Sequence, residues 1–164
     1  MAKNVTNDDA SGPIAPVVLD EKDRRIVSAL QRDARLSYRE LAKRTGYSVL
    51  TVMKRVRALE RQGVILGSRL KLDYERLGYS VHAIIEVRIA KGKLFEMERK
   101  IASERGVYAV FDHTGPFDTT LLARFRSTRE LDRFLKRVQT YEFVERTETK
   151  LVLNTMKMED VEPA

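Results

Sequence analysis

The sequence predicts an α+β protein in which an N-terminal winged-type helix-turn-helix domain precedes a ferredoxin-like βαββαβ domain. In residues 19–66, apolar residues recur at helical spacing, and capping residues or glycines flank each segment. From residue 80 the pattern changes to period-two alternation interrupted by two helical stretches, in the order βαββαβ. With 164 residues, 43% of them apolar, the chain can bury two small cores.

Composition excludes several classes of function. The chain has no cysteine, which removes disulfides, thiolate metal sites and cysteine nucleophiles. It has no apolar run of about 18 residues, and its N-terminus shows no basic start followed by an apolar stretch. We therefore expect no membrane partner, no export and a cytoplasmic location.

Positive charge is concentrated in the first half of the chain. The net charge is +7, yet residues 20–72 alone hold 14 basic and 6 acidic residues, a net charge of +8. A locally basic domain indicates a polyanionic partner rather than a generally soluble surface.

The N-terminal domain begins after a tail. Residues 1–18 mix small polar residues with two prolines and show no periodicity, so we expect a flexible tail. Asp20 is placed to cap a first helix whose inner stripe is Ile26, Val27 and Leu30.

Two further helices are predicted, with a short turn between them. Ser37 and Glu40 have the spacing of a capping box at the start of a helix that stops at Gly46. Ser48 then caps a helix that extends to about Gln62 and is followed by a glycine. This arrangement predicts a helix-turn-helix, in which the last helix enters the DNA major groove.

The third helix has two chemically different faces. Its predicted inner face consists of Val49, Val52, Val56 and Leu59. The outer face carries cations suited to phosphates, together with an aliphatic tip and a hydroxyl suited to base edges. We therefore predict that these residues of the second and third helices contact double-stranded DNA: Arg39, Lys43, Ser48, Leu50, Thr51, Lys54, Arg55, Arg57 and Arg61.

A connecting segment, residues 67–79, is expected between the domains, with a wing-like turn at Gly67-Ser68. The βαββαβ domain then occupies residues 80–158, and residues 159–164 form a second tail. Its elements are expected at residues 80–90, 93–106, 107–113, 117–125, 127–141 and 143–153.

Alternation along the first strand separates the two faces of the predicted sheet. Val81, Ala83, Ile85, Val87 and Ile89 face the helices. The opposite face is too apolar for full hydration and too charged for a core, which favours contact with a second copy of the chain. It is predicted to contain His82, Ile84, Glu86, Arg88, Val110, Leu122 and Val152.

Three segments resemble the Lrp/AsnC (feast/famine) family of transcriptional regulators. They are LDEKDRRIVSALQRDARLSYRELAKRTGYS, the third helix with VRALERQGVILG, and HTGPFDTTLLARF, and the resemblance covers about residues 19–157. It implies a DNA-binding N-terminal domain and a C-terminal domain that forms a homodimer, with assembly into an octameric ring of four dimers. It also implies an amino-acid effector.

The resemblance places this effector at the turn Gly115, Pro116, Phe117 and Asp118, with hydroxyls from Thr147 and Thr149 on the closing strand. In this turn, proline replaces an acidic residue that the family usually has. In a purely structural alternative, Gly115 serves the hairpin turn, Phe117 packs in the core and Asp118 accepts a hydrogen bond from a local backbone donor. No other cofactor and no metal are expected.

An enzyme and an architectural DNA-packing protein are the two alternative functions. An enzyme is not expected, because Asp112 and His113 are adjacent on a strand and point to opposite faces, and no phosphate loop or metal-ligand spacing occurs. An architectural, largely non-specific DNA-packing protein is the open alternative to a sequence-specific regulator, since both need a basic helix-turn-helix.

Overall fold

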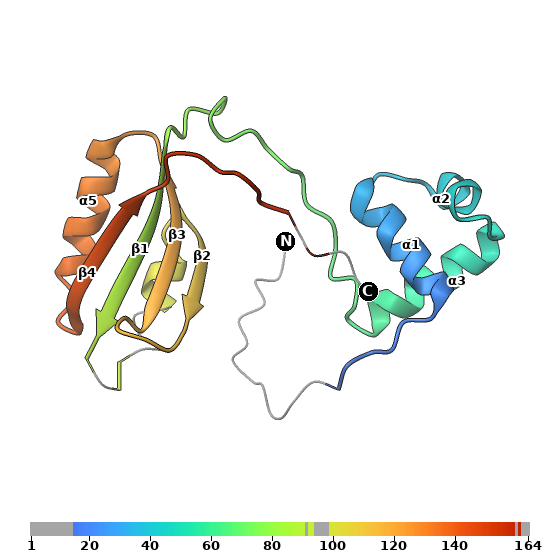
Figure 1. Ribbon diagram of the computed structural model, residues 1–164, viewed down its shortest axis with the longest axis horizontal. Helices are drawn as coiled ribbons and strands as arrows, with labels where there is room; N and C mark the ends of the chain where they lie inside the picture. The colour runs from blue at the N-terminus through green and yellow to red at the C-terminus, as the bar shows by residue number, and fades with distance from the viewer. Residues whose placement is uncertain (1–14, 91, 94–98, 160, 162–164) are drawn as a thin grey trace. The chain divides into compact units, whose positions relative to one another are not determined.

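The computed structural model describes residues 15–90, 92–93, 99–159 and 161 (Figure 1). They divide into two compact units, one containing the residues up to Leu70 and the C-terminal end from Glu159, the other comprising Lys71–Met158. Each unit has its own hydrophobic core, so each is described by itself.

Three capped helices form the N-terminal unit: α1 (Glu21–Arg32), α2 (Tyr38–Thr45) and α3 (Val49–Arg61). The predicted caps are confirmed. Asp20 accepts from the backbone N–H of Asp23, and Ser37 and Glu40 form the expected reciprocal capping box. Gly46 ends α2 with φ of +79°, a left-handed conformation that favours glycine.

The core of this unit is small and contributed by all three helices. Ile26, Leu41 and Val52 are completely buried, and Val56 packs with them. The prediction for Val49 is wrong, because its side chain is 43% exposed. Val49 is the first residue of α3, one turn before the part of the helix that α1 and α2 cover.

The connecting segment contains no helix or strand, and its residues 74–78 form a turn. Residues 65–73 have no assigned secondary structure, and no described residue of the N-terminal unit belongs to a strand pair. The predicted wing-like turn at Gly67-Ser68 is not formed, although Gly67 has φ of +143°.

A four-stranded antiparallel sheet forms the C-terminal unit. Its strands are β1 (Val81–Ile89), β2 (Val107–Asp112), β3 (Thr119–Phe125) and β4 (Val144–Leu151), in the order β2-β3-β1-β4. Helix α5 (Thr128–Gln139) precedes β4, contacts β3 and β4, and is capped by Ser127. The central position of β1 between β3 and β4 is that of a ferredoxin-like βαββαβ fold.

The helix-facing side of this sheet is the core. Ala83, Ile85 and Val87 are completely buried, as the period-two pattern predicts, and Phe134 of α5 packs on them. Part of the helix predicted at residues 93–106, namely residues 94–98 with Leu94, lies outside the described residues. Residues 99–102 are helical, and Ile101 is completely buried.

A β-bulge changes one predicted side-chain orientation. The register of β2 shifts between Val107 and Ala109, and Val110 then pairs with Leu121 and packs against the core. The prediction that Val110 lies on the opposite face is therefore wrong, because the extra residue of the bulge reverses the alternation. Phe111, which is 52% exposed, takes that place.

Candidate DNA-binding surface and effector turn

The outer face of α3 forms a continuous stripe. Leu50, Lys54, Arg57 and Arg61 are all exposed and follow one another at helical spacing over about 16 Å. The buried face of the same helix, with Val52 and Leu59 at 0% and 1% exposure, fixes the orientation of this stripe. A helix presented in this way fits the major groove, which is about 12 Å wide.

The cations of α3 differ in their partners. Within the described part of the chain, Lys54, Arg57 and Arg61 take part in no ion pair or side-chain hydrogen bond. By contrast, the Nη1 atom of Arg55 lies 2.7 Å from a carboxylate oxygen of Asp20 and 3.3 Å from one of Asp23. Arg55 therefore joins α3 to the start of α1, whereas its neighbours remain available to an external anion.

The remaining predicted DNA contacts lie at the start of α3 and on α2. The Ser48 hydroxyl accepts from the backbone N–H of Thr51 at 3.1 Å and bonds the Thr51 hydroxyl at 2.8 Å, so Ser48 is used as the helix cap. Arg39 and Lys43 are exposed and four residues apart on α2, which places both on one side of that helix.

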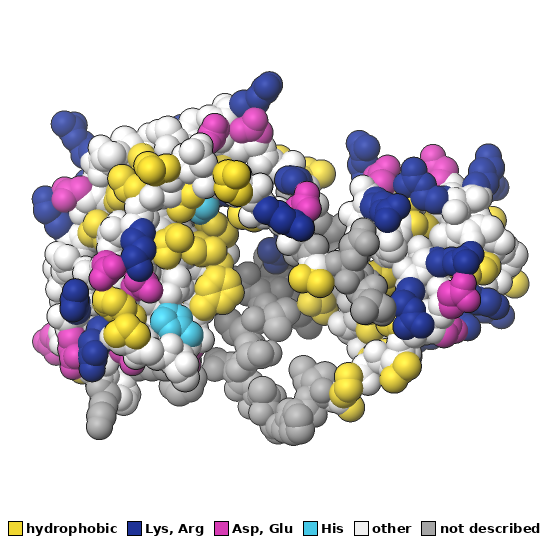
Figure 2. All heavy atoms as spheres, in the orientation of Figure 1, with side chains coloured by type: hydrophobic (Ala, Val, Ile, Leu, Met, Phe, Trp, Pro, Cys, Tyr) yellow, Lys and Arg dark blue, Asp and Glu magenta, His cyan; other side chains and the backbone are white. Residues whose placement is uncertain are grey.

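The side of the sheet that is turned away from its core is named here the open sheet face. Figure 2 shows hydrophobic side chains gathered over the strands of this unit, with histidine side chains among them. Its polar groups are paired with one another: His82 Nε2 lies 2.7 Å from the Tyr108 hydroxyl, and Lys150 forms an ion pair with Glu86. Register places on this face Ile84, Glu86, Arg88, Phe111, Leu122 and Lys150, and the backbone N–H of Val152 donates to His82.

The predicted effector turn is held mainly by its own backbone and neighbours. The Asp118 carboxylate accepts from the backbone N–H of Ile89 at 2.8 Å, and the backbone N–H of Asp118 donates to the carbonyl of Val87. Phe117 is 7% exposed, and Gly115 has φ of +138°. These contacts agree with the structural alternative, while the role of the turn in effector binding stays a prediction.

Thr147 and Thr149 lie on the core side of the sheet. They pair with Val87 and Ile85, whose side chains are buried, and the Thr147 hydroxyl accepts from Gln139 of α5 at 3.2 Å. Register brings Thr147 to the same end of β1 as Asp118, because Val87 pairs with Thr147 and accepts from Asp118 N–H.

Two arginines beside the turn were not predicted as effector residues. Arg88 and Arg146 are directly opposite each other on β1 and β4. Arg88 Nη1 donates to the carbonyl of Pro116 at 3.1 Å, and the Arg146 guanidinium lies 5.6 Å from the centre of the Phe117 ring. Their proximity depends on strand register, and no sequence motif signals it.

The described part of the chain contains neither a metal-binding cluster nor a membrane-spanning helix. Among the described residues, no group of three or more His, Asp or Glu side chains is arranged to hold a metal ion. No helix in the described ranges combines the length and apolar character needed to cross a membrane.

Comparison with known proteins identifies both units. Residues 19–65 match the family described as winged helix-turn-helix DNA-binding, and residues 82–161 match the Lrp/AsnC ligand binding domain. An uncharacterized HTH-type transcriptional regulator of Pyrococcus abyssi is 41% identical over 140 residues, which cover 85% of this chain and 95% of that protein.

Solved structures give the same result. The structure of E. coli AsnC matches with a TM-score of 0.83 at 30% identity and covers 90% of this chain and 100% of that chain. A transcriptional regulator of Neisseria meningitidis in complex with L-Met matches with a TM-score of 0.83 at 26% identity, covering 89% and 97%. The protein is thus a helix-turn-helix DNA-binding regulator with a ligand-binding domain. It belongs to the Lrp/AsnC family.

Proposed function

We propose that the protein is a sequence-specific transcriptional regulator that binds DNA as a homodimer and responds to an amino acid or a related small metabolite. The observation that carries this proposal is the α3 stripe, in which cations without an ion-pair partner among the described residues adjoin an exposed apolar tip. Lys54 and Arg57 supply charge for phosphates or guanine, and Leu50, at 56% exposure, supplies a surface for a thymine methyl group.

Specificity distinguishes this proposal from an architectural DNA-packing protein. A packing protein needs phosphate contacts only, whereas an exposed leucine at the start of α3 contributes nothing to binding a phosphate. The exposed Leu50 therefore favours a regulator that reads base sequence over a DNA-packing protein.

The test is a selection of preferred duplexes from a random pool, followed by binding measurements at fixed salt. Lys54→Ala is expected to cost about 1–3 kcal/mol on the selected duplex and to relax preference at one base position. Arg129→Ala, which removes an exposed cation of α5, is the matched control and is expected to change neither. If no duplex is enriched and Lys54→Ala weakens all sequences equally, the protein is a non-specific DNA packer.

The open sheet face supports the proposed homodimer. Ile84, Phe111 and Leu122 form its apolar part, and paired polar groups surround them, a composition typical of protein interfaces. Leu122→Lys is expected to give monomers in light scattering, whereas Leu153→Lys, at a position that is 89% exposed, leaves the dimer intact. A dimer that persists in Leu122→Lys places the interface elsewhere.

The cross-strand arginine pair supports an effector with a carboxylate. Like charges directly opposite each other in a sheet are destabilising, and an anion beside Arg88 and Arg146 would relieve this repulsion. The nearby carboxylates do so only partly, with Glu145 3.4 Å from Arg88 and Glu148 3.8 Å from Arg146.

A thermal-shift screen of the standard amino acids tests effector binding. A ligand at a hundred times its dissociation constant adds about 2.7 kcal/mol of stability. We expect Arg146→Gln and Asp118→Asn to reduce the shift and Arg133→Gln, an exposed cation of α5, to leave it unchanged. A screen without any shift, or a shift unchanged in both site variants, would contradict the proposed location.

A further inference from the structure

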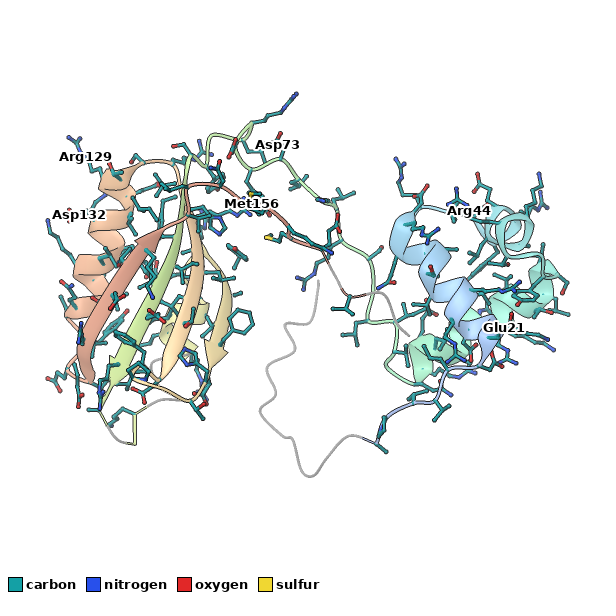
Figure 3. All side chains as sticks on the ribbon, viewed as in Figure 1. Glu21, Arg44, Asp73, Arg129, Asp132 and Met156 are labelled. Atoms are coloured by element: carbon teal, nitrogen blue, oxygen red, sulfur yellow. The ribbon has the colours of Figure 1, made fainter. Side chains whose placement is uncertain are left out.

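A second basic feature of the N-terminal unit lies outside α3. It is a groove of about 790 Å³ between α1 and α2, with Arg44 at the C-terminal end of α2 (Figure 3). Ala29 and Thr45 are buried small residues in its lining, so the helices leave a hollow between the long side chains beside them. This arginine groove is lined by four guanidinium groups, those of Arg24, Arg25, Arg32 and Arg44.

The arginine groove has a strong excess of positive charge. Asp33 is the one carboxylate among its lining residues, which gives the described lining a formal charge of +3. This carboxylate is engaged, because it accepts from the backbone N–H of Arg35 at 3.0 Å and from Arg35 Nε at 3.3 Å. Arg25 also pairs with Glu21 at 2.7 Å on the exposed surface, where such a pair is weak and readily exchanged for another anion.

The arginine groove and the α3 stripe face different directions. Helix α3 meets α1 on the side of Asp23, through Arg55. Arg32 follows Asp23 by nine residues, which at about 100° per residue places it on the opposite side of α1. A duplex bound along the outer face of α3 therefore leaves the arginine groove open to a separate ligand.

The lining indicates the chemistry of that ligand. It contains no aromatic ring and no large apolar side chain, so it offers no aromatic stacking platform for a nucleobase and no enclosure for an apolar metabolite. Guanidinium groups on an open surface suit phosphate groups, and the DNA backbone is bound through charge and hydrogen bonds alone. We propose that the arginine groove binds the backbone of a second DNA duplex while α3 is bound to the first. This inference extends the proposed function and depends on α3 being the reading helix.

The experiment measures two binding steps with the full chain. An operator duplex containing both half-sites is attached to beads and saturated with protein, and capture of a fluorescent duplex of unrelated sequence is then measured. The groove variant is Arg32→Gln with Arg44→Gln, which removes one cation from each helix and keeps both side chains long. The matched control is Arg129→Gln with Arg133→Gln on α5.

We expect the groove variant to bind the operator within about twofold of the unsubstituted chain. Its capture of the second duplex should fall by about tenfold. The salt slope of this capture, which is the slope of log affinity against log salt concentration, should be lower by about two. The control variant should retain both steps. If the groove variant captures the second duplex as well as the unsubstituted chain does, the proposal is overturned. The partner of the arginine groove would then be an acidic protein. An equal loss in both steps also overturns it, because the groove would then contact the first duplex.

Lys54→Ala separates this proposal from the proposed function. It should weaken operator binding while the second step, measured on bead-bound protein at equal loading, remains unchanged. If Lys54→Ala leaves operator binding unchanged, the reading helix is misassigned whatever the groove variant does. If it abolishes the second step at equal loading, the second duplex is held by α3 and the groove proposal is overturned.

Discussion

The α3 stripe and the open sheet face differ in how their cations are partnered. On the open sheet face, Lys150 pairs with Glu86, and Arg88 lies 3.4 Å from Glu145. On α3, Lys54 and Arg57 have no ion-pair partner among the described residues. Cations already neutralised within the fold stabilise or orient it, whereas unpaired cations in a row remain available for a polyanion. This difference supports the proposed DNA contact through α3 and the proposed dimer contact through the open sheet face.

The largest expected effect is the unfolding of the N-terminal unit when its core is destabilised and the core of the sheet is left intact. Ile26 is completely buried in the N-terminal core, which shares no residue with the core of the sheet. Ile26→Ala is expected to cost about 2–5 kcal/mol, enough to unfold a small unit. In calorimetry the transition of the N-terminal unit and DNA binding should be lost, while that of the sheet remains.

Val49→Ala is the matched control for Ile26→Ala. Because Val49 is 43% exposed, its truncation should cost less than about 0.5 kcal/mol. Simultaneous loss of both transitions in Ile26→Ala would show that the two cores unfold as one.

The next largest effect is a loss of DNA affinity when cations of the α3 stripe are removed. Arg57→Ala with Arg61→Ala should weaken operator and unrelated DNA alike and lower the salt slope by about two, because each phosphate contact contributes about 0.9. Lys136→Ala removes a cation of α5 that pairs with Asp132 at 2.8 Å and should leave DNA affinity unchanged. If both variants lower the salt slope equally, pairing within the fold does not predict which cations bind DNA.

A smaller effect is expected for Arg55, the paired cation of α3. Its side chain is 38% exposed, so loss of its contacts to Asp20 and Asp23 should cost about 1 kcal/mol or less of unfolding free energy. Arg55→Ala should lower the melting temperature of the N-terminal unit and leave the salt slope of DNA binding unchanged. A slope lower by about one would instead support the sequence-based prediction that Arg55 contacts DNA.

The smallest effect is a pH dependence within the sheet. Burial lowers the pKa of His82 below its ordinary value, and the positive charge of Arg124 lowers it further. The folded protein therefore binds this proton less tightly than the unfolded chain, and stability should fall as the pH drops through about 6.5, the ordinary pKa of histidine.

Melting temperatures at pH 7.5 and 5.5 test this dependence. His82→Gln should show a smaller decrease than the unsubstituted chain. Tyr108→Phe, which removes the hydroxyl 2.7 Å from His82 Nε2 but keeps the imidazole, should retain the decrease. An identical decrease in His82→Gln would assign the pH dependence to other groups.

Much of the fold and the exposed stripe of α3 were predictable because they depend on local interactions. The caps at Asp20, Ser37 and Ser48 act within three residues of their partners, and the exposed stripe of α3 follows from helical periodicity. The core side of β1 follows from strict alternation, so Ala83 and Ile85 were correctly predicted to be buried.

The sequence by itself thus determined the element order, the helix caps, the basic N-terminal unit and the resemblance to its family. Tertiary structure alone decided which cations of α3 are paired, because the partners of Arg55 are more than thirty residues away in the sequence. It also decided the orientation of Val110, through a bulge in β2, and the meeting of Arg88 with Arg146, through the register of β1 and β4. The physical reason is that bulges, register and ion pairs between helices depend on contacts between distant segments, which local periodicity does not specify.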